Sequence, residues 1–262
     1  MTDYQFLAHL NIDCERPKEA LENILTLCSK SAKLTLEQRD LLNLAVKTSV
    51  DPTRSSVKKL NNIITTERSA GHSENVEELL KIKKNCVTEI LDICNKTLDV
   101  IEHVLIPENS DDRVSLIHYQ KVRGDLYRYI IEVNPDQENA FKNASDSYNY
   151  AYVNCQELLE PCIPIRLGTF LNYAVFKYEY LKCVEEATEM LQQALAHYTE
   201  GLDKQSQVVK EDVLNIVRVI RDNIQLWTVA DSTDDSEPEE EEEEEEDHQD
   251  SPNHYDSEEE DD

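Results

Sequence analysis

The feature that most constrains the fold is a long helical pattern of apolar residues between positions 73 and 107. In "SENVEELLKIKKNCVTEILDICNKTLDVIEHVLI", apolar side chains recur every three or four residues for about eight turns. The pattern predicts one long helix with Ser73 as its N-cap and with Pro107 at its end. The whole chain has four glycines, whereas β-rich folds use glycine in their many turns. The sequence therefore predicts a helical fold.

Similar apolar stripes occur before and after this segment. Two helices are indicated between residues 20 and 45, and further helices are expected at 113–133, 137–159, 165–182, 184–201 and 207–228. Short stretches such as "NPDQ" and "EPCIP" separate them and have the chemistry of turns. We therefore expect an all-α domain over residues 1–230, with about nine antiparallel helices.

The end of the chain has a different composition. Residues 231–262 contain 20 acidic and no basic side chains, which leaves 35 acidic and 26 basic residues for positions 1–230. Eight consecutive glutamates repel one another and bury no apolar surface, so a disordered acidic tail is expected at 231–262. The tail either keeps the protein in solution or competes with partners for a basic site. The first 230 residues are long enough to bury a large core.

Several functional classes are disfavoured by the sequence. No signal peptide or membrane-spanning segment is found, and the seven cysteines form no C-x-x-C pair, as expected of reduced thiols. We expect a cytoplasmic location, with the nucleus as an open alternative, and neither membrane nor nucleic acid as a partner. There is no H-x-x-x-H pair, glycine-rich phosphate loop or nucleophile elbow. We therefore expect no metal, no cofactor and no enzyme activity.

A basic cluster stands out in this acidic chain, whose formal net charge is −29. The stretch "YQKVRGDLYRYI" at 119–130 contains three cations, and on a helix Lys121, Asp125, Arg128 and Glu132 share one face. The cations are either neutralised by these carboxylates or kept for an anion from outside. In "AVKTSVDPTRSSV", two further cations lie seven residues apart on one face, if a helix continues past the proline.

Two segments place an asparagine within an apolar stripe. "PIRLGTFLNYAVFKYEY" aligns Asn172 with apolar neighbours, and "LNIVRVIRDNIQLW" does the same for Asn223. A buried amide destabilises the fold unless it has a hydrogen-bond partner. Each asparagine therefore either bonds to another helix or grips the backbone of an extended peptide.

The stretches "KVRGDLYRY", "PIRLGTFLNYAVFKYEY" and "RDNIQLWT", with "LIP" after the long helix, closely resemble the 14-3-3 proteins over about residues 35–229. The resemblance implies a cup of nine helices with a concave amphipathic groove that binds phosphoserine or phosphothreonine peptides. It also implies an adaptor that holds or sequesters phosphorylated clients. The implied phosphate pocket consists of Lys47, Arg54, Arg128 and Tyr129. The implied peptide groove consists of Lys121, Leu171, Asn172, Val175, Glu179, Ile216, Val219, Asn223 and Trp227.

The chemistry of phosphate agrees with this assignment. A phosphorylated side chain carries about −1.5 to −2 charges near pH 7, and guanidinium groups bind its oxygens with two parallel hydrogen bonds. The resemblance thus favours an external anion over internal pairing. The alternative function is an acidic-tail chaperone for basic proteins such as histones, which would ignore phosphorylation.

The chain also departs from the family pattern. Pro52 stands between the two cations of the first basic segment and has no N–H for the carbonyl of Thr48, so a local kink is expected. The resemblance implies a homodimer, or a heterodimer with a related subunit. The matching interface positions are Leu10, Ile12, Arg16, Glu19, Ile82 and Glu89. Arg16 and Glu89 match one inter-subunit salt bridge, but most other ion pairs are missing, so we expect a dimer weaker than is usual in the family.

Overall fold

The structure, a computed structural model, describes residues 2–234. Within that range it contains nine helices of ten or more residues and no strand, which confirms the all-α prediction. The last helix extends to residue 234, beyond the expected domain boundary at 230. The remainder of the expected tail, 235–262, lies outside the described residues.

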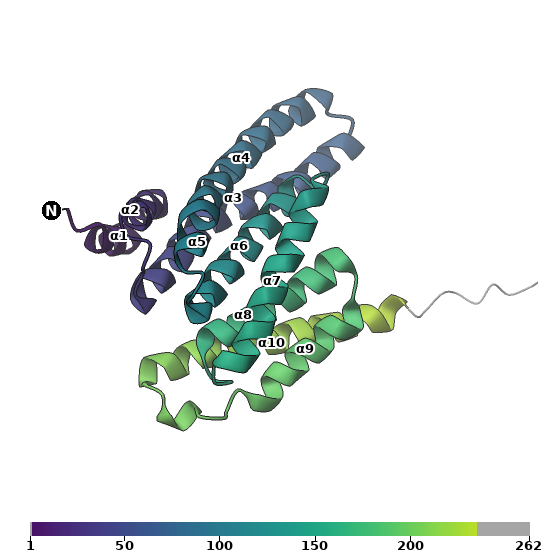
Figure 1. Cartoon of the computed structure of the whole chain (residues 1–262). Helices are drawn as coiled ribbons and strands as arrows, with labels where there is room; N and C mark the ends of the chain where they lie inside the picture. Colours follow the sequence, from purple (N-terminus) through teal and green to yellow (C-terminus); the bar gives the residue numbers. More distant parts are fainter. Residues whose placement is uncertain (1, 235–262) are drawn as a thin grey trace, which may run out of the picture.

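The helices follow one another with short connections (Figure 1). The nine longer helices are α1 (Tyr4–Asp13), α2 (Pro17–Lys30), α3 (Leu36–Ser69), α4 (Ser73–Val100), α6 (Arg113–Val133), α7 (Glu138–Leu158), α8 (Pro164–Phe176), α9 (Val184–His197) and α10 (Gln207–Asp234). Four short elements join them: the π-helical η1 (Ile101–Leu105), α5 (Ile106–Glu108), the π-helical η2 (Lys177–Leu181) and the 3-10 turn η3 (Leu202–Lys204).

The observed helix bounds confirm most of the predicted helices and correct some of their ends. Helix α6 has the bounds that the apolar spacing predicts. The prediction that Ser73 is an N-cap is wrong by one residue, because Ser73 is the first helical residue and His72 occupies the cap without a side-chain hydrogen bond. The helical run passes through η1 and ends at Glu108, one residue beyond Pro107. Helix α3 continues through Pro52 without interruption, so its two cations stay on one helix.

Neighbouring helices pack in pairs around one continuous core. Helix α3 packs on α4, α6 on α7, and α8 on both α9 and α10. Figure 1 shows α1 and α2 at the left of the molecule, α3 and α4 toward the top, and α8, α9 and α10 at the bottom. Helices α6 and α7 lie between the upper and the lower group. The core extends from Ala8 on α1 to Trp227 on α10. Helices distant in sequence are thereby held in fixed positions around a shared cavity.

The contact between α6 and α7 depends on a glycine. A Cβ atom at Gly124 would lie 2.8 Å from the ring of Tyr148, so the absence of a side chain lets this ring lie directly on α6. The ring of Tyr148 also stacks on Tyr173, at 5.6 Å between centroids, and packs against Phe176. These contacts fix the position of the Tyr148 hydroxyl beside the polar face of α6.

Candidate functional site

A cavity of ≈ 370 Å³ lies between α3, α6, α8 and α10. Its basic side is formed by Lys47 and Arg54 of α3 with Lys121 and Arg128 of α6. The facing side is largely apolar and is formed by Pro164, Ile165, Gly168, Leu171 and Ile216. The carboxylates of Asp40, Asp51 and Asp125 also line the cavity. The arrangement therefore sets cations against an apolar wall.

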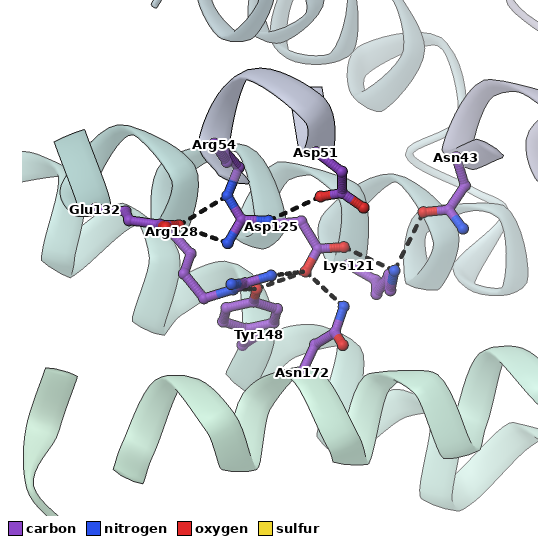
Figure 2. A network of polar contacts seen from close by, with 9 residues as sticks. All are labelled: Asn43, Asp51, Arg54, Lys121, Asp125, Arg128, Glu132, Tyr148 and Asn172. Atoms are coloured by element: carbon purple, nitrogen blue, oxygen red, sulfur yellow. Dashed lines mark hydrogen bonds and ion pairs between the residues drawn. The ribbon is translucent and has the colours of Figure 1, made fainter. Parts of the chain in front are cut away.

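Asp125 is the centre of the polar network in Figure 2. Its side chain is almost fully buried, and it pairs with the Nζ of Lys121 at 2.7 Å. It also accepts hydrogen bonds from the Tyr148 hydroxyl at 2.6 Å and from the Nδ2 of Asn172 at 2.7 Å. Burial alone would raise the pKa of Asp125, but Lys121 and Arg128 beside it hold the pKa below its usual value. A charged carboxylate thus anchors one cation and one amide from two different helices.

Arg54 is held by two other carboxylates. Its Nε and Nη2 donate to Oε2 of Glu132 at 2.7 and 2.5 Å, and its Nη1 donates to Oδ1 of Asp51 at 2.8 Å. The side chain is 14% exposed. The guanidinium group is therefore fixed in orientation at the edge of the cavity before any ligand arrives.

Arg128 and Lys47 are less engaged by other side chains than Arg54 is. The Nε of Arg128 donates to the Tyr148 hydroxyl at 3.2 Å, and its Nη2 lies 3.8 Å from Asp125, beyond hydrogen-bond length. The side chain of Arg128 is 10% exposed, yet its terminal nitrogens make no hydrogen bond with any residue that the structure describes. Lys47 is exposed and likewise has no ion pair within 2–234. Both cations retain donors for a ligand in the cavity.

Tyr129 lies between the two arginines of the cavity. The guanidinium carbons of Arg54 and Arg128 lie 4.2 and 4.8 Å from the centre of its ring, at cation–π distance. Burial, together with the charge of Asp125, raises the pKa of Tyr129. The hydroxyl therefore stays protonated and can donate a hydrogen bond to an anion.

The internal-pairing alternative holds for part of the basic cluster. Lys121 pairs with Asp125, and it also donates to Oδ1 of Asn43 at 3.1 Å. Arg123 points away from the cavity and binds Glu102 of η1 at 2.7 Å. Internal pairing and an external anion are thus compatible here, because the carboxylates orient some cations and leave others with free donors.

The two asparagines differ in their surroundings. Asn172 lines the cavity and bonds to Asp125 of another helix, whereas the Nδ2 of Asn223 donates to the carbonyl of Val219 on its own helix at 2.8 Å. Neither side-chain oxygen accepts a hydrogen bond from the part of the chain described by the structure. Each amide therefore still offers an acceptor to a peptide N–H.

Five of the expected groove residues do not line this cavity: Val175, Glu179, Val219, Asn223 and Trp227. Trp227 is buried and stacks on Tyr178 of η2, with ring centres 4.3 Å apart and an angle of 9°. Glu179 is exposed within η2. Three further residues contribute to the site and were not expected from the sequence: Asn43, Asp51 and Tyr148. Asp51 could have been found, because it precedes Arg54 by three residues on a helix, whereas Tyr148 gives no local signal.

The expected dimer-interface charges are paired within the chain. Arg16 binds Glu19 at 2.7 Å, and Glu89 binds Lys18 at 3.0 Å and the hydroxyl of Thr53 at 2.6 Å. The expected apolar residues Leu10 and Ile82 are 43% and 51% exposed. Ile12 packs partly against the core. The inter-subunit bridge between Arg16 and Glu89 stays a prediction.

Across residues 2–234, none of the helices has the length and apolar character needed to span a bilayer.

Comparison with known proteins identifies clear relatives. A family model described as 14-3-3 protein matches residues 7–228. The chain is 32% identical to 14-3-3 protein 7 of Solanum lycopersicum over 225 residues, which cover 85% of this chain and 89% of the relative. It is 32% identical to a 14-3-3 protein of Giardia intestinalis over 238 residues, or 89% of this chain and 95% of the relative. It is 33% identical to the checkpoint signal transducer rad24 of Schizosaccharomyces pombe over 228 residues, which cover 86% of this chain and 84% of the relative.

Proposed function

The chain belongs to the 14-3-3 family, whose members are non-enzymatic phosphopeptide-binding adaptors, and we propose that it binds phosphoserine or phosphothreonine in the cavity between α3 and α6. The observation that carries the proposal is the state of Arg128. A guanidinium group that is nine-tenths buried keeps its terminal donors without hydrogen bonds among the residues described, and it faces a cavity. These donors are open to the cavity, and an anion there would accept charge-assisted hydrogen bonds from them.

The proposed pocket has a defined division of roles. Arg54 and Arg128 would bind the phosphate oxygens, with the hydroxyl of Tyr129 as a further donor and the exposed Lys47 as a further cation. Asp125 and Glu132 would act as positioning residues, since they fix the cations without contacting the ligand. A carboxylate ligand would gain less than a phosphate, because it has one negative charge and two oxygens.

The rest of the client would lie along the cavity. The side-chain oxygen of Asn172 would accept a backbone N–H of the peptide near the phosphorylated residue, and Asn223 would do so farther along. Leu171 and Ile216 would contact apolar side chains, together with Val175 and Val219 farther along. Lys121, Glu179 and Trp227 belong to the same proposed groove, Trp227 by supporting its wall through the stack on Tyr178. The protein would hold its clients rather than modify them, and the fission-yeast relative named a checkpoint signal transducer supports a role in signalling.

We infer further that the protein forms a homodimer or a heterodimer with a related subunit. The exposed apolar residues Leu10 and Ile82 support this, together with the family membership. Ile12, Arg16, Glu19 and Glu89 complete the proposed interface. Because the charges are already paired within the chain, apolar burial would provide most of the association energy.

Fluorescence polarisation tests the phosphopeptide proposal. The full-length protein is titrated into a labelled R-S-x-pS-x-P peptide and into its unphosphorylated twin. We expect binding of the phosphorylated form and at least a hundredfold weaker binding of the twin, because two or more charge-assisted contacts are lost. Equal binding of both forms would contradict the proposal. Binding of any basic protein, regardless of phosphorylation, would favour the acidic-tail chaperone instead.

A further inference from the structure

A second cavity adjoins the proposed phosphate pocket. It has a volume of ≈ 450 Å³ and lies between the α1–α2 turn and the outer side of α3. We call it the Pro52 pocket. It is lined by Ile12, Glu15, Pro17, Leu44, Lys47, Thr48, Asp51 and Pro52. Four of these eight residues are apolar, and most of the surface that lines the pocket is apolar.

The Pro52 pocket shares two lining residues with the phosphate cavity. Lys47 and Asp51 line both cavities, and they lie one turn apart on α3. They therefore form a low ridge with the phosphate cavity on one side and the Pro52 pocket on the other. A helix with its side chains is about 10 Å across, and an extended chain advances about 3.3 Å per residue, so roughly three residues suffice to cross the ridge.

Pro52 leaves one backbone carbonyl of α3 without its usual helical donor. Proline has no N–H, so the carbonyl of Thr48 cannot receive the helical hydrogen bond that an ordinary residue 52 would donate. The hydroxyl of Thr48 does not replace the missing donor, because its hydrogen is shared between the carbonyls of Leu44 at 2.8 Å and Ala45 at 3.3 Å. Both Thr48 and Pro52 line the pocket. A ligand with an N–H donor would therefore be favoured over a purely hydrocarbon one.

The carboxylates at the edge of the Pro52 pocket also favour a ligand that carries a hydrogen-bond donor. Glu15 is exposed at the turn between α1 and α2 and forms no ion pair within the described range. Asp51 is engaged by Arg54 at 2.8 Å. The pocket thus combines apolar walls with a carboxylate and a carbonyl, and an indole group offers the matching combination of a large apolar face and a single N–H donor.

We propose that the Pro52 pocket is a specificity subsite that binds an apolar, N–H-bearing side chain of the client, with tryptophan as the best fit, about three residues from the phosphorylated residue. This inference rests on the proposed phosphopeptide function. The occupant is the client itself, because the pocket shares Lys47 with the phosphate cavity. The client would be held at two points, by its phosphate and by one anchoring side chain.

The test uses phosphopeptides that share one core and carry either Trp, Phe or Ala at the second, third or fourth residue before or after the phosphoserine. Affinities are measured by fluorescence polarisation with the full-length protein and with two single variants. Leu44→Ser alters an exposed wall of the pocket, while Leu36→Ser removes a similarly exposed leucine of α3 that lines neither cavity. Leu36→Ser is thus the matched control, and thermal melting checks that both variants fold.

We expect the wild type to prefer Trp over Ala about three- to tenfold at one or more of these positions. Leu44→Ser should reduce this preference to less than about twofold and leave the affinity for the Ala peptide unchanged, while Leu36→Ser should keep the preference. In Pro52→Ala the alanine N–H occupies the Thr48 carbonyl, so the preference for Trp over Phe should fall.

Three results would overturn the inference. The first is equal affinity for the Trp and Ala peptides at every position, with phosphorylation still required. The second is an unchanged preference in Leu44→Ser. The third is a Leu44→Ser variant that dissociates into monomers on sedimentation while keeping the Trp preference, which would assign the pocket to a second copy of the chain. A loss of phosphate dependence in all peptides would instead refute the proposed function itself.

Discussion

The hydroxyl of Tyr148 on α7 donates a 2.6 Å hydrogen bond to the carboxylate of Asp125 on α6. The same hydroxyl accepts a hydrogen bond from the Nε of Arg128 at 3.2 Å. One phenol therefore connects the buried carboxylate with the cation that faces the cavity (Figure 2). Tyr148 is itself fully buried, and its ring rests on Gly124. The packing between α6 and α7 thus determines the position of Arg128.

Gly124→Ala should disturb this arrangement. The new methyl group would meet the Tyr148 ring at 2.8 Å, and both groups lie in a packed interface. Overpacking costs about 1–3 kcal/mol, which outweighs the gain of about 0.5–1 kcal/mol from replacing a helical glycine. We expect a lower urea midpoint and weaker phosphopeptide binding. Gly168→Ala is the control for stability alone, because no atom lies within 4 Å of the added methyl, and its urea midpoint should be unchanged or higher. Equal midpoints for the two variants would contradict this account of the contact.

The sequence predicted the individual helices better than it predicted which side chains of different helices meet at the cavity. Helix α6 was placed residue for residue, because its apolar spacing follows the helical period over its whole length. Helix α8 ends at Phe176 and is followed by the π-helical η2, which contains Glu179. Because a π-helical turn is wider than an α-helical one, α-helical spacing alone does not fix the direction of Glu179 relative to Asn172. The role of Glu179 in the groove stays a prediction.

Contacts between helices could not be predicted from the helical spacing of apolar residues. The pairing of Arg54 with Glu132 joins residues 78 positions apart, and the contact of Tyr148 with Asp125 joins two helices. Helical spacing indicates which side chains share a face, but it does not indicate which helix covers that face. The family resemblance supplied the common location of Lys47, Arg54 and Arg128, and all three line one cavity in the structure.

Arg128→Ala should abolish phosphopeptide binding while the fold survives. Each charge-assisted contact contributes about 1.5–3 kcal/mol, so losing the donors of Arg128 should weaken binding at least about tenfold. Lys47→Glu should act in the same direction, by removing a cation and adding a repelling charge. Fluorescence polarisation measures the affinities, and circular dichroism checks the helices. Arg123→Ala is the matched control, because Arg123 binds Glu102 outside the cavity and should leave peptide affinity unchanged. Wild-type affinity in Arg128→Ala would refute the site assignment.

His118 should make stability depend on pH. Its side chain is buried, and burial together with the charges of Arg39 and Lys121 lowers its pKa to about 3. Asp112 opposes this lowering of the pKa only in part, and Asp40 lies 3.9 Å from the ring. The folded state keeps His118 neutral, whereas the unfolded chain takes up a proton near pH 6.5. Stability should therefore be full above about pH 6.5 and fall as the pH drops toward 4, by about 1 kcal/mol per pH unit.

Urea unfolding at several pH values measures this effect. The variant His118→Gln has no proton to take up, so its stability should change less between pH 6.5 and 4.5, although its absolute stability is lower. Asp125 does not affect the comparison between pH 6.5 and 4.5. Its pKa is lowered in the folded state, so its contribution to the free energy of unfolding is lost only below about pH 4. Parallel pH profiles for wild type and variant would show that His118 is not the responsible group.

Self-association should be weak and little sensitive to salt. In the expected interface, Arg16 is paired with Glu19 and Glu89 with Lys18 in the same chain, so an inter-subunit bridge would have to replace existing ion pairs. A surface ion pair contributes about 0–1 kcal/mol, and the exchange of one pair for another contributes less. The exposed apolar side chains of Leu10 and Ile82 should then provide most of the binding energy. Sedimentation velocity over a dilution series, at salt concentrations from about 0.05 to about 0.5 M, should give nearly constant dissociation constants. Ile82→Ser should dissociate the dimer, while Arg16→Gln should have little effect. A dimer that separates when salt alone is raised would show that charges hold the subunits together.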